Sequence, residues 1–139
     1  MGMGTWGVNV EAISADNLKK ICPEGFSKLD EKLKSIDAGW NDLAASVQYD
    51  YWLGDRLEDA PADDLDEIND LWVALTVDFE KKTGLELSAT HYDEGSGDRY
   101  DEPCDHEGMI FTLDGVYQMT PAAEKMKDMI EYSRFTVWG

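Results

Sequence analysis

The apolar and polar positions near the start of the chain predict a strand followed by a short helix. Apolar residues alternate with small or polar ones over Thr5 to Ile13, a period of two that is typical of a strand with one buried face. Ser14 then offers a suitable N-cap, because its hydroxyl can accept a hydrogen bond from the first turn of a helix. We therefore expect a short helix over Ala15 to Ile21, which Pro23 interrupts.

A spacing of three or four residues between apolar positions predicts three further helices. The first runs from Phe26 to near Gly39, and the second runs from Trp40 to Tyr51. The aromatic run of Tyr49, Tyr51 and Trp52 at the end of the second is equally compatible with an extended chain. The third, from Asp63 to Lys82, has the clearest pattern: acids crowd its first turn, lysines occupy its last turn, and Gly84 follows as a left-handed stop. Its apolar positions follow the helical period and comprise Leu65, Ile68, Leu71, Trp72, Leu75 and Phe79.

The pattern changes to a period of two after this helix. Alternation over Leu85 to Tyr92 predicts a strand, and an acidic loop over Asp93 to Gly108 follows it. Met109 to Leu113 and Val116 to Met119 flank the dipeptide Asp114-Gly115, which favours a two-residue hairpin turn. We therefore expect these two segments to form a β-hairpin.

The last part of the chain predicts one more helix and a closing strand. Thr120 and Pro121 are suited to the N-cap and first position of a helix that ends near Glu131, and Tyr132 to Trp138 alternates again. Together the elements predict the α+β class, with a largely antiparallel sheet of about four or five strands and helices packed on one face. A chain of 139 residues has the size of one globular domain, which we assign to residues 1–139.

Acidic residues are concentrated in two segments. The chain has 30 Asp and Glu against 12 Lys and Arg, a net charge of −18. Residues 50–78 contain ten acids and one base, and residues 93–107 contain seven acids and one base, so fifteen of the eighteen net charges lie in these segments. Such a field opposes direct binding to nucleic acid phosphates or to an anionic membrane surface. A basic protein surface is the partner that it favours.

Nothing in the sequence indicates export or a membrane anchor. The apolar runs are far shorter than the roughly 20 residues that a spanning helix needs, and the first residues lack the basic and apolar regions of a signal peptide. Cys22 and Cys104 are isolated, and isolated cysteines in such a chain are usually reduced thiols. We expect a cytoplasmic protein without a cofactor.

Three potential zinc ligands lie in or beside the acidic loop, namely His91, Cys104 and His106. They lack the paired CxxC or HxxxH spacing of structural zinc sites. The carboxylates of the loop do not fit the twelve-residue calcium pattern in any register. A solvated acidic loop is the simpler interpretation, and the sequence by itself predicts no metal.

Cys104 and His106 are also the best candidates for a nucleophile and a base. A pair of this kind needs a third group to orient it, and none is evident. The neighbouring carboxylates raise the pKa of the thiol, which opposes formation of the reactive thiolate. The sequence contains no GxSxG, P-loop or dinucleotide-binding motif. A non-catalytic protein is therefore favoured over an enzyme.

The long predicted helix carries a stripe of carboxylates beside its apolar face, at steps of three and four residues. Carboxylates with aromatic rings nearby suit a partner rich in Lys and Arg, because charge steers association and rings contribute cation–π contacts. The predicted partner-binding residues are Asp63, Asp66, Glu67 and Asp70 with Tyr51 and Trp52, and in a second arm Asp98, Asp101, Glu102 and Asp105. The simpler interpretation is a solvated helix face whose first-turn acids stabilise the helix itself.

The function that these patterns favour is a non-catalytic interaction module, of the inhibitor, immunity-protein or nucleic-acid-mimic type, which presents carboxylates to a basic partner. Two alternatives remain. One is a metal-dependent or hydrolytic enzyme that uses His91, Cys104 and His106. The other is an ordinary domain with an acidic surface adapted to concentrated salt, which the excess of Asp over Glu fits and the uneven charge distribution does not.

Overall fold

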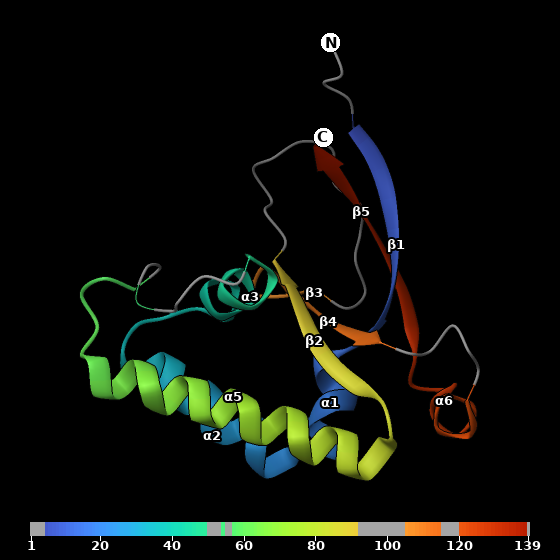
Figure 1. The fold of residues 1–139 in the computed structure, drawn as a ribbon, viewed down its shortest axis with the longest axis horizontal. Coiled ribbons are helices and arrows are strands. Elements are labelled where there is room, and N and C mark those ends of the chain that lie inside the picture. Colours follow the sequence, from blue (N-terminus) through green and yellow to red (C-terminus); the bar gives the residue numbers. More distant parts are fainter. Residues whose placement is uncertain (1–4, 50–53, 55–56, 92–104, 115–119, 139) are drawn as a thin grey trace.

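The helices and strands follow one another in nearly the predicted order (Figure 1). The computed structural model describes residues 5–49, 54, 57–91, 105–114 and 120–138. Within this part the α+β class is confirmed, and helices hold more residues than strands. The sheet is therefore not the dominant part of the domain.

The first helices start at residues whose local chemistry explains the boundary. Strand β1 spans Thr5–Ile13 and helix α1 spans Ala15–Ile21, both as predicted. The Ser14 hydroxyl accepts a hydrogen bond from the backbone N–H of Asn17 at 3.2 Å, as an N-cap does. Helix α2 spans Pro23–Ser35, so its proline stands at the first helical position, where the missing N–H costs no hydrogen bond.

Helix α2 ends at Ser35, earlier than the predicted end near Gly39. Asp37 adopts the left-handed conformation with a φ of 57°. The backbone N–H groups of Asp37 and Ala38 donate to two carbonyls of the last turn, in the Schellman arrangement that closes a helix. Because Asp tolerates this conformation better than most residues, the helix stops although the apolar spacing continues.

Helix α3 spans Trp40–Tyr49, and the long helix α5 spans Ala62–Thr83. Helix α5 has the predicted stop, since Gly84 follows it with a φ of 78°. The predicted apolar positions of α5 are all buried or partly buried. Helices α2 and α5 run side by side (Figure 1) and approach so closely that a Cβ at Gly25 would lie 3.2 Å from a side-chain atom of Leu75.

The strands form one antiparallel sheet in the order β2-β4-β1-β5, and β3 also pairs with β4. The remaining bounds are Glu86–His91 for β2, Asp105–His106 for β3, Met109–Asp114 for β4, Pro121–Met126 for α6 and Glu131–Trp138 for β5. Strand β1 pairs with β4 only through Ala12 and Ile13, whereas it pairs with β5 from Thr5 to Ala12. Strands β1 and β5 therefore extend past the other strands as a two-stranded ribbon (Figure 1).

The acidic loop predicted over Asp93 to Gly108 is wrong at its C-terminal end. Asp105 and His106 form strand β3, which pairs with the start of β4. Glu107 and Gly108 connect the two strands with φ angles of 52° and 86°, the combination that a two-residue hairpin turn requires. The sequence does not predict this turn because Glu is uncommon at a left-handed position.

The hairpin predicted around Asp114-Gly115 is tested only in its first half. Its first strand is present as β4, and Val116 to Met119 lies outside the described residues. The helix predicted to reach Glu131 is wrong in length, since α6 ends at Met126. Glu131 instead begins β5 and pairs with Ala12, so sheet pairing overrides the local helix preference there.

The core is one buried cluster in which helices and sheet meet. Its largest fully buried side chains are Trp40, Phe26, Phe79, Phe111, Ile13, Leu18, Leu29, Leu33, Leu43, Ile68 and Leu75. Strand β4 is buried along its whole length except at Asp114. Phe111 and Thr112 are neighbours on β4 and point to opposite faces, so both faces of this central strand are covered.

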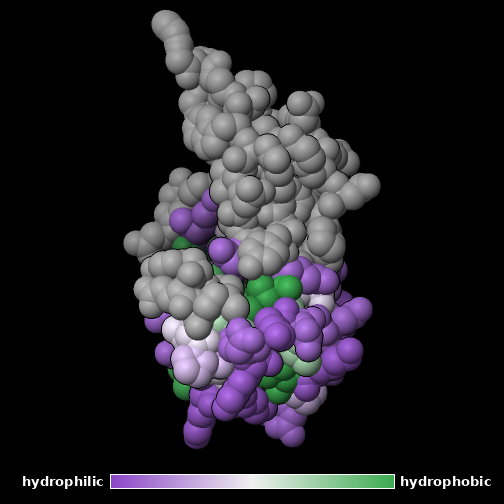
Figure 2. All heavy atoms as spheres, turned by 90° about the vertical axis from the view of Figure 1, so that its right-hand side faces the viewer, coloured by the Kyte–Doolittle hydropathy of each residue, from purple (hydrophilic) through white to green (hydrophobic). Residues whose placement is uncertain are grey.

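The surface on the side of α6 is mainly hydrophilic. Figure 2 shows this side, and hydrophobic residues appear there only in small, separate areas among the coloured atoms. No helix within the described ranges is long and apolar enough to cross a membrane. The parts of the surface with a distinctive composition lie on α5 and beside the β3–β4 turn.

Candidate functional site

The acidic half of α5 faces solvent. The segment from Leu57 to Asp70 contains seven acids and no base. Asp63, Asp66 and Asp70 are exposed. No ion pair to these three carboxylates is formed by any residue in the part of the chain that the structure describes.

Glu67, the fourth predicted acid of this helix, has a different role from the other three. Lys32 of α2 places its Nζ 2.8 Å from Glu67 Oε2 and 2.6 Å from Asp64 Oδ1. Hydrogen bonds first to Asp64 and then to Glu67 raise the pKa of Lys32 above its usual value. Glu67 therefore helps to fix α5 against α2, and it shares the single positive charge of Lys32 with Asp64.

Two exposed valines continue the line of free carboxylates. The side chains of Val73 and Val77 are 56% and 59% exposed, and they are the exposed large apolar side chains among the described residues. Steps of three and four residues place them on the same side of the helix as the acids. We call this set the outer stripe of α5, and it comprises Asp63, Asp66, Asp70, Val73 and Val77. The sequence pattern predicted the acids of this stripe but not its valines, although neither valine fits the buried spacing.

Several predicted partner-binding residues are not described by the structure. Tyr51, Trp52, Asp98, Asp101 and Glu102 lie outside the described residues, and so does the candidate ligand Cys104. Asp105 and His91 are described in their backbone alone, where they pair with Ile110 and Met109 of β4. The second acidic arm therefore stays a prediction.

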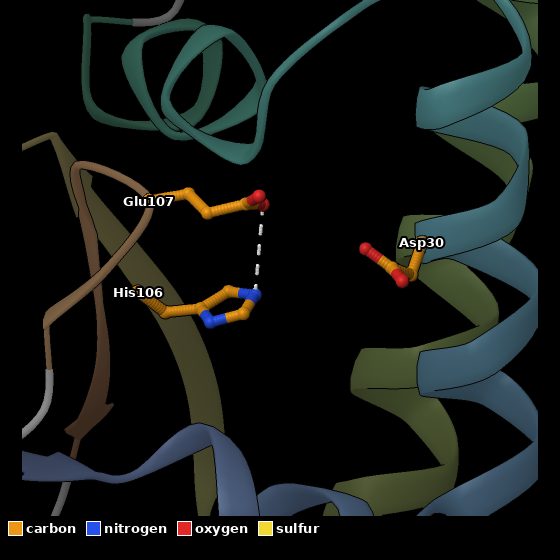
Figure 3. A group of neighbouring side chains, drawn as sticks. All are labelled: Asp30, His106 and Glu107. Carbon is orange, nitrogen blue, oxygen red and sulfur yellow. Dashed lines mark ion pairs between the residues drawn. The ribbon is translucent and has the colours of Figure 1, made fainter.

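His106 lies in a cluster that the sequence did not predict. His106 from β3 and Glu107 from the following turn face Asp30 of α2 (Figure 3). His106 Nε2 and Glu107 Oε2 are 3.7 Å apart. One potential ligand atom from each of the three residues lies within 4.8 Å of the other two. We call this group the Asp30–His106–Glu107 cluster.

Aromatic rings surround the imidazole of this cluster. The ring centroids of Phe26 and Trp40 each lie 5.6 Å from that of His106, and the Phe111 ring lies 6.0 Å away, nearly parallel to it. Phe26 and Trp40 also stack on each other at 4.9 Å. Packing against three rings restricts the orientation of the His106 ring and shields one side of the cluster from water.

Two donors hold the carboxylate of Asp30. The indole Nε1–H of Trp40 donates to Oδ1 at 2.8 Å, and Lys34 Nζ donates to Oδ2 at 2.8 Å. Partial burial by itself raises the pKa of Asp30, but the hydrogen bonds from Lys34 and Trp40 outweigh it and hold the pKa below its usual value. Asp30 is therefore an ionised carboxylate in a fixed orientation.

Sequence reasoning missed the Asp30–His106–Glu107 cluster because nothing local connects its members. Asp30 is an ordinary polar position of an amphipathic helix, and His106 follows it by more than seventy residues. Only the β3–β4 hairpin brings His106 and Glu107 to α2. The predicted set of His91, Cys104 and His106 is thus represented in the described side chains by His106 alone.

A cleft of about 480 Å³ lies between α2 and α5, with Gly25 and Asp78 among its lining residues. The thiol of Cys22 is nearby, buried and hydrogen-bonded to Asp78. Burial, and then the hydrogen bond and negative charge of Asp78, raise the pKa of Cys22 to about 11. Cys22 is therefore a protonated, poorly nucleophilic thiol at neutral pH, which does not suit covalent catalysis.

Comparison with known proteins identifies no relative of this chain. No protein-family model matches it. No curated protein matches it significantly. No solved structure matches it significantly. Its function is therefore argued from its own residues.

Proposed function

We propose that this protein is a non-catalytic interaction module that binds a basic surface of another protein through the outer stripe of α5. The observation that carries the proposal is the composition of this stripe: three exposed carboxylates without an ion pair to any described residue, followed on the same helix face by two exposed valines. In this proposal the module acts in the cytoplasm, where a buried free thiol such as Cys22 stays reduced.

Each half of the stripe contributes something different to binding. The carboxylates attract Lys and Arg over a distance and so raise the association rate, an effect that salt weakens. The valines supply apolar area that leaves water on contact, which stabilises the complex by about 1 to 2 kcal/mol for each side chain that becomes fully buried. Charge thus sets how fast the complex forms, and apolar contact sets how long it lasts.

The packing of α5 against the rest of the protein limits the conformational entropy that is lost when a partner binds to the stripe. The opposite face of α5 is anchored in the core by Leu65, Ile68, Trp72, Leu75 and Phe79. Lys32 ties the acidic half of the helix to α2. Because the helix is already fixed, its residues lose little conformational freedom when a partner binds.

The valines also separate this proposal from its simplest alternative. An acidic coat that serves only solubility in concentrated salt needs carboxylates and water, and it gains nothing from apolar side chains in the same line. An interface needs both kinds of side chain close together. Val73 and Val77 directly follow Asp70 along the outer stripe, which favours an interface.

Charge reversal on the stripe tests the proposal. The protein is immobilised to capture basic proteins from an extract of its source cells at low salt, and association rates are then measured with the purified captured partner. Asp66→Lys with Asp70→Lys should slow association about ten-fold or more at low salt, because steering can account for such factors. Asp16→Lys with Asp128→Lys is the matched control, since both residues are exposed acids outside α5.

The acids and the valines of the stripe should affect different rate constants of binding. Val73→Ser and Val77→Ser should speed dissociation and leave the association rate nearly unchanged. Equal association rates for the stripe variant and its matched control would contradict the proposal, as would capture of basic proteins by both variants to the same extent as the wild type. Circular dichroism confirms that each variant is folded.

A further inference from the structure

We propose that the Asp30–His106–Glu107 cluster binds a divalent metal ion of the zinc class, through one imidazole nitrogen and one oxygen from each carboxylate. This site is independent of the outer stripe of α5. Its donors come from two parts of the chain, Asp30 from α2 and the other two from the β3–β4 hairpin, and they face one another across a small gap (Figure 3).

The spacing of the donors is close to that of a bound ion. Zinc bonds to nitrogen and oxygen of about 2.0 to 2.1 Å in a tetrahedron place neighbouring ligand atoms about 3.4 Å apart. His106 Nε2 and Glu107 Oε2 are already at 3.7 Å. All three ligand atoms lie within 4.8 Å of one another, so no pair of them has to close by more than about 1.4 Å. The half-exposed side chain of Glu107 can supply part of this movement while Asp30 keeps its hydrogen bond from Trp40.

The chemistry of the donors selects the class of ion. Imidazole nitrogen suits zinc and its first-row neighbours, whereas magnesium and calcium prefer oxygen ligands throughout. Two carboxylates together with a neutral imidazole balance the charge of a divalent cation. Three protein ligands leave a fourth position for water, as in sites where zinc is exchangeable or catalytic.

The surroundings of the cluster match the support that metal ligands usually have. Ligating carboxylates are commonly held by a hydrogen bond from a second residue, and the Trp40 indole N–H makes this bond to Asp30 at 2.8 Å. Packed rings fix the imidazole of His106. The side chains of Asp30 and His106 are 23% and 22% exposed, and that of Glu107 is 51% exposed, so an ion has a path from solvent.

Lys34 is the competitor of the metal ion at this site. Its ammonium group donates to Oδ2 of Asp30, and its positive charge opposes the approach of a cation to this carboxylate. The Lys34 side chain is 68% exposed, so it can turn into solvent with little loss of stability. Removal of this lysine should therefore strengthen metal binding, an effect that a merely structural cluster would not show.

The test is a titration of the chelator-treated full chain with Zn²⁺ by calorimetry, and with Co²⁺ by absorption spectroscopy. The wild type should bind one ion tightly. His106→Ala and Glu107→Gln should each weaken binding by more than about ten-fold, the loss that even supporting residues of metal sites cause. Lys34→Ala should tighten binding. Glu107→Gln keeps the test valid if His106→Ala fails to fold, since Glu107 is half exposed.

Two matched controls distinguish this site from the alternatives. His91→Ala removes the other histidine, and Asp16→Asn removes an exposed acid outside the cluster, so both should leave the affinity unchanged. Loss of binding in His91→Ala with no effect in Glu107→Gln would overturn the proposed ligand set. Weak binding of several ions that all variants share would also overturn it, because that behaviour belongs to the acidic surface as a whole.

Discussion

Replacing Trp40 by Phe tests whether one indole N–H couples α3 to α2. Trp40 is the first residue of α3 and is 1% exposed. Its ring stacks on Phe26 at 4.9 Å, and its Nε1–H donates to Asp30 Oδ1 at 2.8 Å. Phe keeps an aromatic ring that can stack on Phe26 but removes the donor. The substitution therefore isolates the hydrogen bond from most of the packing.

The expected loss of stability follows from two contributions. A hydrogen bond to a charged group contributes about 1.5 to 3 kcal/mol, and the lower end applies because Asp30 is 23% exposed and water can replace part of the lost bond. The smaller ring loses roughly 1 kcal/mol of buried apolar contact. Trp40→Phe should therefore lower the free energy of unfolding by about 2 to 3 kcal/mol.

The ionic part of this loss depends on pH in a defined direction. The bonds from Lys34 and Trp40 hold the pKa of Asp30 below its ordinary value of 3.8. A carboxyl with a lowered pKa stabilises the fold above that ordinary value, and the contribution disappears as pH falls through the folded pKa. The difference between wild type and Trp40→Phe should therefore shrink in acid. Urea unfolding followed by far-UV circular dichroism measures it.

Trp72→Phe is the matched control for this experiment. Trp72 is a nearly buried tryptophan of α5, and its indole makes no hydrogen bond to a described residue. Its substitution removes ring area without touching an ion, so its cost should not vary over the same acid range. A Trp40→Phe effect that is equally independent of pH would refute the reasoning, as would a double-mutant cycle with Asp30→Ala whose coupling energy is near zero.

Three further predictions concern the packing of α5, the backbone at Gly84 and the ionisation of Cys22. Leu75→Ala should lower the free energy of unfolding, measured in urea, by about 3 kcal/mol because it leaves a cavity at a fully buried site. Val77→Ala, on the exposed side of the same helix, should change it by no more than about 0.5 kcal/mol. Equal changes for the two variants would contradict the orientation of α5. Gly84→Ala should lower the free energy of unfolding by about 1 to 2 kcal/mol, since φ is 78° and the new Cβ would lie 2.7 Å from that of Ala122. An unchanged midpoint of urea unfolding would contradict this backbone conformation. Cys22 has a pKa raised from 9.0 to about 11, so the folded thiol keeps its proton while the unfolded one loses it. As the pH rises from 9.0 to about 11, the free energy of unfolding of the wild type should therefore fall by about 2 kcal/mol relative to that of Cys22→Ala. Urea unfolding at several pH values measures this difference, and parallel pH profiles of the two proteins would show that the pKa is not raised.

The elements that the sequence predicts well are those whose cause is local. Helix α5 has acids at its start, lysines at its end and Gly84 after it, and its bounds differ from the prediction by one residue at each end. Ser14 caps α1 as its side chain predicts. In each case the deciding interaction joins residues a few positions apart, so a linear pattern contains it.

Two elements that the sequence predicts poorly depend on pairing with another strand. Strand β3 consists of two residues in an acidic segment, and it is a strand because it pairs with β4 across the turn at Glu107 and Gly108. The helix predicted to reach Glu131 cannot do so, because Glu131 pairs with Ala12 in the sheet. The first turn lacks the Asn-Gly or Asp-Gly signature of a hairpin, and the partner of Glu131 lies near the other end of the chain, so the local pattern shows neither event.

The candidate sites divide in the same way. The composition of the chain by itself determined that carboxylates crowd the first half of α5, and helical periodicity determined that they share a side of the helix. Only the tertiary structure decided which of these carboxylates form an ion pair with a described residue, because Lys32 comes from α2 and pairs with both Asp64 and Glu67. Likewise only folding brings Asp30 to His106. Periodicity acts over a turn or two of one helix, whereas charge balance and ligand geometry depend on distances in space between segments that the sequence keeps apart.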